Sequence, residues 1–151
     1  MTNALVLYTI LTKKFPDDML NFTRLGVLYD YCEQDTQAKR NFNRAISEDS
    51  TRPIVYYYYG NFFYKRSMFK KALKMYKDAY KKDFDSDYQT NYQIGDIYVK
   101  LGDTEASLKY LNKALEIDPN EELLEKISEV EQLHQINKVY YSNTAFQLIE
   151  R

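Results

Sequence analysis

The chain has 151 residues and carries 21 basic and 22 acidic side chains, so its formal net charge is −1. A charge this close to zero implies neither a nucleic-acid partner nor an anionic membrane. Four Gly and three Pro exclude a low-complexity linker, and a hydrophobic content of 44% is typical of a globular chain.

Residues 1–18 begin with an apolar run, Ala4 to Tyr8. The run is too short to cross a bilayer and no positive charge precedes it, so we do not interpret it as a targeting segment. We predict a helix here whose apolar flank has no partner in the chain before it.

Residues 19–52 contain two stretches in which apolar or small side chains recur at helical offsets of three, four or seven. The first stretch holds Phe22, Leu25, Gly26 and Tyr29, and the second holds Ala38, Phe42 and Ala45. Asp17 or Asp18 can cap the first helix, and Asp35 can cap the second. The pattern predicts a helical hairpin.

Residues 53–87 repeat this hairpin with more aromatic side chains. The repeating positions are Tyr56, Tyr59, Gly60, Phe63, Ala72, Met75, Tyr76 and Ala79. Pro53 suits the first turn of a helix, and Ser67 can cap the second helix. Gly60 costs a helix roughly 1 kcal/mol relative to Ala. We therefore expect another backbone to pass close to Gly60, with Ala72 as its neighbour.

Residues 88–121 show the same pattern a third time. The matching positions are Asn91, Ile94, Gly95, Tyr98, Ser107, Leu111 and Ala114. Asp87 opens the first helix, Gly102 ends it as a left-handed cap, and Asp103 or Thr104 starts the second helix.

Residues 119–139 predict a further helix, which begins at Pro119 with a capping box between Asp118 and Glu121. Its apolar stripe is Leu123, Leu124, Ile127, Val130 and Leu133, and glutamates cover the rest. We interpret it as a polar capping helix. For residues 140–151 we predict a short C-terminal helix or tail after a break near Ser142 and Asn143.

The three hairpins are copies of one unit. Gly26, Gly60 and Gly95 recur at spacings of 34 and 35 residues, a period typical of a helical solenoid. The pattern resembles the tetratricopeptide repeat, with copies at 19–52, 53–87 and 88–121. Departures from the family pattern are Asn91, Ser107, Ser50 and Phe84. The resemblance implies an all-α, right-handed superhelical solenoid of antiparallel helix pairs.

Residues 1–18 match the second helix of such a repeat. Ala4, Tyr8 and Leu11 lie 34 residues before Ala38, Phe42 and Ala45. The chain is therefore either a piece of a longer array or a chain that begins on a half-repeat, and both interpretations stay open.

The first helix of residues 53–87 is apolar nearly all round, whereas the second helix carries a lysine face. In the family that the chain resembles, the first helices line a concave groove. The side chains that we predict to face this groove are Thr23, Val27, Asp30, Tyr31, Tyr57, Asn61, Tyr64, Lys65, Tyr92, Asp96, Val99 and Lys100. Tyrosines with few charges suit an extended or helical peptide.

Some members of this family hold the acidic C-termini of heat-shock chaperones with a clamp of Lys, Asn and Arg. The aligned positions in this chain hold Thr23, Val27, Tyr58, Gln89 and Gln93. We therefore expect no binding of a chaperone tail by these three copies.

Side chains suited to catalysis or metal binding stand alone in the sequence. His134 is the only His and Cys32 the only Cys, and neither has a partner at the spacing of a metal site or of a nucleophile and its base. We expect no enzyme, no metal and no cofactor. A single Cys favours a reducing compartment, so we predict a cytoplasmic protein.

These features predict a non-catalytic scaffold or adaptor that binds a protein or peptide partner in the groove. One alternative is a structural subunit of a larger assembly or homo-oligomer, joined through the apolar flank of residues 1–18. Another alternative is RNA binding through the lysine face, because residues 53–86 carry a net charge of +5 and residues 87–151 carry −6.

Overall fold

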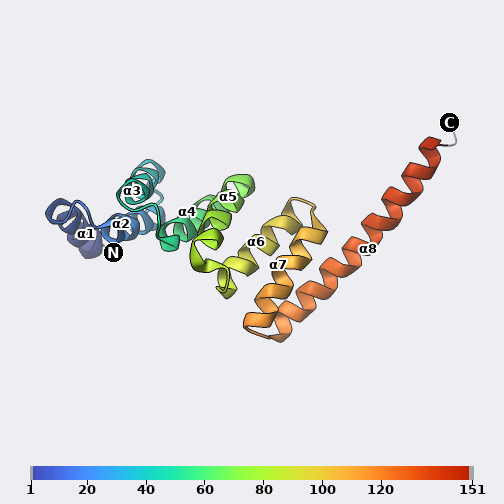
Figure 1. The fold of residues 1–151 in the computed structure, drawn as a ribbon. Helices are drawn as coiled ribbons and strands as arrows, with labels where there is room; N and C mark the ends of the chain where they lie inside the picture. Colours follow the sequence, from blue (N-terminus) through green and yellow to red (C-terminus); the bar gives the residue numbers. More distant parts are fainter. Residues whose placement is uncertain (1, 150–151) are drawn as a thin grey trace. The chain divides into compact units, whose positions relative to one another are not determined.

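The computed structural model describes the backbone of residues 2–149 and the side chains of residues 3–141. The regular elements in this part of the chain are all helices (Figure 1), which confirms the predicted fold class. They divide into two compact units, which we call unit 1 (residues 1–85) and unit 2 (residues 86–151).

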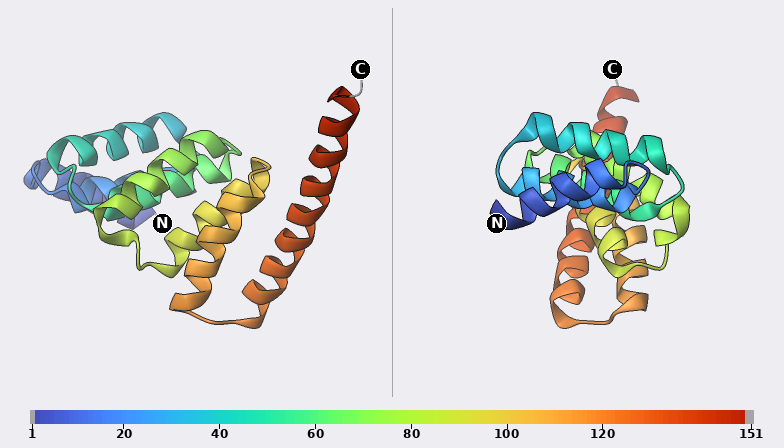
Figure 2. Two further views of the ribbon diagram at one scale, coloured as in Figure 1. Left: turned by 45° about the vertical axis from the view of Figure 1, so that its right-hand side comes forward. Right: turned by 90° about the vertical axis from the view of Figure 1, so that its left-hand side faces the viewer.

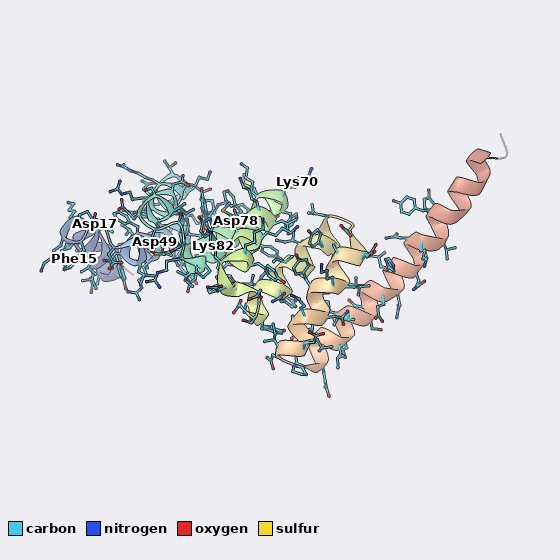
Figure 3. All side chains as sticks on the ribbon, in the orientation of Figure 1. Phe15, Asp17, Asp49, Lys70, Asp78 and Lys82 are labelled. Atoms are coloured by element: carbon cyan, nitrogen blue, oxygen red, sulfur yellow. The ribbon has the colours of Figure 1, made fainter. Side chains whose placement is uncertain are left out.

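Unit 1 contains α1 (Thr2–Lys14), α2 (Met19–Tyr31), α3 (Asp35–Glu48), α4 (Pro53–Lys65), α5 (Phe69–Ala79) and the π-helical turn η1 (Tyr80–Phe84). α2 pairs with α3, and α4 pairs with α5 (Figure 2). Phe15 and Asp17 lie in the turn between α1 and α2, and Lys70 lies in the first turn of α5 (Figure 3).

Aromatic rings join the two helix pairs of unit 1. Phe42 of α3 stacks on Tyr59 of α4 with ring centroids 5.0 Å apart, and Tyr59 stacks on Phe63 at 4.6 Å. Phe42 and Phe62 are fully buried. Each aromatic pair contributes about 0.5–1.5 kcal/mol beyond the burial of its surface, so this aromatic cluster fixes α4 against α3.

Unit 2 contains α6 (Tyr88–Lys100), α7 (Thr104–Ile117) and α8 (Glu121–Ile149). Its core is aliphatic and lies between α7 and α8, where Leu111 and Ala114 meet Leu123, Ile127 and Val130. The buried positions on α8 are spaced by four and three residues, so they occupy one face of that helix.

The three repeated glycines lie in one kind of environment. A β-carbon at Gly60 would lie 2.8 Å from the ring of Tyr76, and one at Gly26 would lie 2.9 Å from the ring of Phe42. The predicted close approach is therefore present, but the neighbour is Tyr76 and not Ala72. The large side chain four residues after the alanine fills the space that glycine leaves open.

Gly95 repeats this arrangement in unit 2. A β-carbon there would lie 2.7 Å from the side chain of Leu111 and 3.2 Å from its backbone nitrogen. Gly95 is therefore the third instance of the position that Gly26 and Gly60 occupy.

Each helix pair turns through a residue with positive φ: Glu33 at 56°, Ser67 at 54° and Gly102 at 81°. The next amide in each turn donates back to the helix that has just ended, as when Met68 N donates to Phe63 O at 3.0 Å. This is the Schellman ending of a helix. The prediction for Gly102 is confirmed.

The same turns correct two predicted caps. Ser67 ends α4 and does not cap α5, whose N-cap residue is Met68. Asp35 is already inside α3, where Gln34 is the N-cap. Asp18 is confirmed as a cap, because its carboxylate accepts from Leu20 N at 2.9 Å.

α8 begins and ends differently from the prediction. It starts at Glu121 and not at Pro119, and Asn120 caps it by accepting from Leu123 N at 2.9 Å. α8 continues without a break past Ser142 and Asn143 to Ile149. Residues 150 and 151 of the predicted tail lie outside the described residues. None of the described helices is long and apolar enough to cross a membrane.

Candidate functional site

A hollow of about 350 Å³ lies on unit 1 between α1, α2 and α4. Its lining residues are Tyr8, Leu20, Thr23, Arg24, Val27, Leu28, Ile54 and Tyr58. Leu20 and Tyr58 keep 38% and 37% of their surface exposed. The hollow is thus lined mostly by apolar side chains and is reachable from solvent.

Helix geometry explains why these side chains gather. Leu20, Arg24 and Val27 lie at offsets of four and seven on α2, and Ile54 and Tyr58 are four apart on α4. The charge at the hollow comes from Arg24, whose guanidinium carbon lies 5.7 Å from the ring centroid of Tyr8. This contact holds the cation at the rim.

Of the predicted groove residues, Thr23 and Val27 line this hollow. Thr23 is buried, and its hydroxyl donates to the backbone oxygen of Met19 at 2.9 Å. Val27 is half-buried. The Thr23 hydroxyl is therefore already engaged within α2.

Asp30, the next predicted groove residue, is buried and ion-paired. Its carboxylate lies 2.7 Å from the Lys65 ammonium nitrogen and 2.7 Å from a guanidinium nitrogen of Arg66. The Lys65 nitrogen also lies 4.6 Å from the ring centroid of Tyr31, which is 64% exposed. Asp30 thus ties the end of α2 to the end of α4.

Arg66 completes this junction. Its Nε donates to Asp35 at 2.8 Å, and its Nη1 also donates to the backbone oxygen of Phe62 at 2.9 Å. The hydrogen bond from Arg66 holds the pKa of Asp35 below its ordinary value. The residues Asp30, Tyr31, Glu33, Asp35, Lys65 and Arg66 surround a polar hollow of about 560 Å³.

Of the predicted groove residues of α4, Lys65 is exposed and the other three are half-buried. Tyr57 packs edge-on against Tyr76 with centroids 5.8 Å apart, and Asn61 accepts a hydrogen bond from the Tyr76 hydroxyl at 2.5 Å. Tyr64 packs against Phe69 at 5.8 Å. These contacts orient the α4 side chains from α5, while part of each surface stays open.

Unit 2 has a hollow of about 440 Å³ between α6 and α8. Its lining residues are Tyr92, Val99, Glu122, Glu125, Lys126, Glu129, Val130 and Leu133. Tyr92 and Val99 are predicted groove residues. The three glutamates of α8 are exposed, so this hollow has an acidic rim and differs in charge from the hollow of unit 1.

Asp96, a predicted groove residue of α6, is buried and pairs with Lys126 of α8. Lys126 also donates to the Tyr92 hydroxyl at 3.2 Å, and Lys100 lies 3.6 Å from Asp96. Burial alone would lower the pKa of Lys126, but the hydrogen bonds to Asp96 and Tyr92 raise it above the ordinary value. The pair joins α6 to α8 with the charges held in place.

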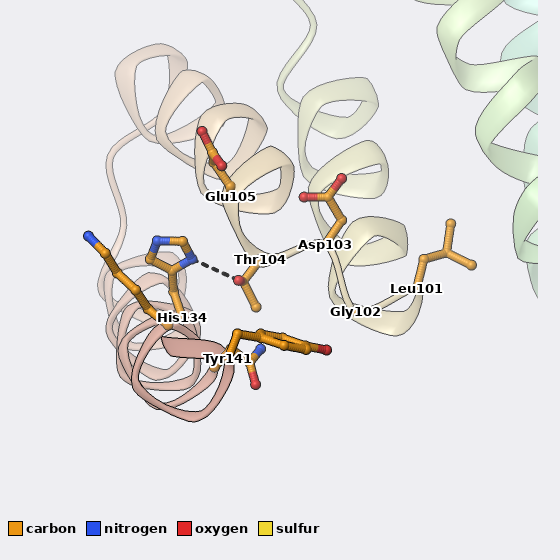
Figure 4. Close-up of a pocket in the computed structure, with 9 residues that line it drawn as sticks. Leu101, Gly102, Asp103, Thr104, Glu105, His134 and Tyr141 are labelled. Atoms are coloured by element: carbon orange, nitrogen blue, oxygen red, sulfur yellow. Dashed lines mark hydrogen bonds between the residues drawn. The ribbon is translucent and has the colours of Figure 1, made fainter. Parts of the chain in front are cut away.

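A further hollow lies where the turn between α6 and α7 meets α8 (Figure 4). In it, His134 Nδ1 and the Thr104 hydroxyl form a hydrogen bond of 2.9 Å. Its lining residues are Leu101, Gly102, Asp103, Thr104, Glu105, His134, Asn137, Lys138 and Tyr141. Among the described side chains, no group of three His, Cys, Asp or Glu residues is placed to hold a metal ion.

Sequence reasoning missed Arg66 and Lys126, which hold the two buried aspartates. It also missed Leu20, Arg24 and Ile54 at the hollow of unit 1. Leu20 and Ile54 share one repeat position, 34 residues apart, and a comparison of that position across the copies could have found them. The ion pairs have no such signal, because Asp30 and Asp96 occupy different repeat positions.

Comparison with known proteins agrees with this architecture. A family model described as "Tetratricopeptide repeat" matches residues 88–121, which include α6 and α7. No curated protein matches the sequence at a significant level. The solved structure of MamA has a TM-score of 0.76 with 17% identity, and the match covers 97% of this chain and 86% of that chain.

Two further solved structures have similar folds. YrrB, described as a TPR protein with an unusual peptide-binding site, has a TM-score of 0.69 with 23% identity, and the match covers 74% of this chain and 57% of YrrB. The N-terminal domain of stress-induced protein-1 from C. elegans has a TM-score of 0.68 with 17% identity, over 75% of this chain and 94% of that domain. At these identities the likeness shows a shared fold.

Proposed function

We propose that this chain, a protein built of tetratricopeptide repeats, is a non-catalytic scaffold that binds a partner polypeptide on the surface of unit 1 lined by α2 and α4, and on the α6 surface of unit 2. The observation that carries the proposal is the open apolar hollow of about 350 Å³ on unit 1. A hollow of this size accepts one or two apolar side chains.

The side chains around that hollow support a peptide as the ligand. Tyr58 gives a large, stiff contact surface with a hydroxyl at its edge, which suits a polypeptide backbone. Leu20 and Ile54 offer apolar contact, and Arg24 can pair with a carboxylate at the rim. The expected ligand of unit 1 is an apolar anchor residue with an acidic residue beside it.

The other predicted groove residues extend this surface within unit 1 and form a separate surface on unit 2. In unit 1 they are Tyr31, Tyr57, Asn61, Tyr64 and Lys65, and in unit 2 they are Tyr92, Val99 and Lys100. Asp30 and Asp96 act differently in this proposal: each is held by basic side chains and positions its neighbours. YrrB, which has a similar fold and is described as having a peptide-binding site, agrees with this kind of role.

Selection of a displayed peptide library on the full chain tests the proposal. We expect enriched peptides that carry an apolar anchor, with affinity reduced about tenfold by Tyr58→Ala or Leu20→Asp. Phe15→Ala is the matched control, because Phe15 is 48% exposed but lies outside the hollow. Equal binding by Tyr58→Ala, Leu20→Asp and the control would contradict the proposal.

A second candidate function is self-association through α1. The observation that favours it is the exposed apolar face of α1, on which Val6, Leu7 and Ile10 keep 55%, 52% and 55% of their surface accessible. An apolar face of this kind marks an interaction site when its side chains are contiguous.

A further inference from the structure

α1 and α8 both present apolar side chains to solvent, and each set follows one face of its helix. On α1 these are Leu7 and Ile10, exposed at 52% and 55%. On α8 they are Leu133, Ile136 and Tyr140, exposed at 39%, 64% and 66%. The offsets of three and four residues place each set on a single stripe.

Charged residues extend both stripes, with opposite signs. The α1 stripe continues past Ile10 to Lys14, which is exposed at the end of the helix. The α8 stripe is preceded by Glu129, which is also exposed and lies at the acidic rim of the unit 2 hollow. Along the chain α1 therefore runs from apolar to basic, and α8 runs from acidic to apolar.

The two stripes have the same spacing when α8 is read backwards. On α1 the stripe positions are 3, 7, 10 and 14, and on α8 they are 140, 136, 133 and 129. The steps are four, three and four residues in both helices. Because every residue of an α-helix adds 1.5 Å, the two stripes match in length position by position.

We propose that α1 of one copy of this chain packs antiparallel on α8 of a second copy. This pairing rests on self-association, the second candidate function above. In this register Leu7 faces Ile136, Ile10 faces Leu133 and Lys14 faces Glu129. Asn3 faces Tyr140, whose hydroxyl can bond the amide. The apolar pairs exclude water from the seam, and the ion pair selects the antiparallel direction.

Charge also favours this pairing over contact between like units. Unit 1 carries 15 basic and 10 acidic side chains, and unit 2 carries 6 and 12. Two copies of unit 1, or two copies of unit 2, repel each other, whereas unit 1 attracts unit 2 of another molecule. The contact joins two different surfaces, so it is heterologous.

A complementation experiment tests the pairing by light scattering or sedimentation over a range of protein concentrations. Wild-type chain should gain mass as concentration rises, while Ile10→Asp and Ile136→Asp should each weaken association by about tenfold or more, since each buries a charge in the seam. An equimolar mixture of the two variants should associate again, because one supplies an intact α8 and the other an intact α1.

Leu124→Asp is the control, because Leu124 is 51% exposed on α8 but lies outside the stripe. It should leave the association unchanged. Charge reversal gives a second route that does not disturb folding: Lys14→Glu and Glu129→Lys should each weaken association by about fivefold, and the variant with both changes should recover it.

The outcomes separate the two levels of the proposal. A wild-type chain that stays monomeric at every concentration would remove self-association and the pairing together. Self-association without recovery in the mixture of Ile10→Asp and Ile136→Asp would leave self-association standing and overturn the α1–α8 contact. An equal effect of Leu124→Asp and Ile136→Asp would also overturn it.

Discussion

Unit 1 and unit 2 each hold a buried aspartate of one helix against at least one basic side chain that follows or belongs to a later helix of the same unit. In unit 1, Asp30 meets Lys65 and Arg66, and Arg66 also binds Asp35. In unit 2, Asp96 meets Lys126 and Lys100. The two aspartates occupy different repeat positions, although Lys65 and Lys100 lie at the same one.

The surfaces around these pairs differ more. The hollow of unit 1 is lined by apolar and aromatic side chains with Arg24 at its rim, whereas the hollow of unit 2 has glutamates on α8. The cores differ too, since unit 1 stacks rings and unit 2 packs aliphatic side chains. The repeated helix pairs therefore determine where a surface lies, whereas the residues between the repeated core positions determine its chemistry.

The largest loss of folding stability is expected from a substitution at the repeated glycine position, at Gly60. Gly60→Leu adds a side chain where a β-carbon alone would lie 2.8 Å from the Tyr76 ring. We expect a loss of about 3 kcal/mol, the upper end of overpacking costs, measured as a lower midpoint in urea unfolding. Lys74→Ala, at an exposed position on α5, should leave the midpoint nearly unchanged. A tolerated leucine at position 60 would show that α4 and α5 can separate without cost.

The two aspartates give the next comparison. Asp96→Ala leaves Lys126 half-enclosed without its carboxylate, and we expect a loss of about 2 kcal/mol. Asp30→Ala should cost less, because Arg66 keeps its bonds to Asp35. Thermal unfolding of both variants measures the difference. A larger loss from Asp30→Ala would reverse our view of which junction depends on one carboxylate.

A smaller difference in stability is expected from substitutions at the turns with positive φ in the two units. Ser67→Gly in unit 1 removes the strain of a left-handed residue with a β-carbon and should stabilise the chain by about 0.5–1 kcal/mol. Gly102→Ala in unit 2 should destabilise it by a similar amount. Melting temperatures should therefore move in opposite directions, and a shift of the same sign in both variants would contradict the strain argument.

The smallest effect concerns titration of Asp35. Arg66 lowers the pKa of Asp35 in the folded chain, so this ion pair stabilises the fold above the ordinary carboxyl pKa of about 3.9 and is lost as pH falls through the lowered value. NMR titration should place the midpoint of Asp35 below its ordinary range. In Arg66→Gln the midpoint should return toward that range, and no change would show that another group lowers it.

The sequence by itself determined the helices and their repetition. The spacing of apolar residues predicted three helix pairs, at 19–52, 53–87 and 88–121. The recurring glycines predicted a close approach of the two helices in each pair. Gly102 was predictable as a left-handed cap, because glycine pays no steric cost there. Ser67 was not predictable, since its left-handed conformation is imposed by the Schellman bonds of the turn.

Only the tertiary structure decided which long-range partners meet. It put Tyr76 and not Ala72 against Gly60, and it put Arg66 and Lys126 on the buried aspartates. Helical periodicity is a local property, set by the 3.6-residue turn. The reach of a long flexible side chain across two helices is not local, and it depends on how the helices stack.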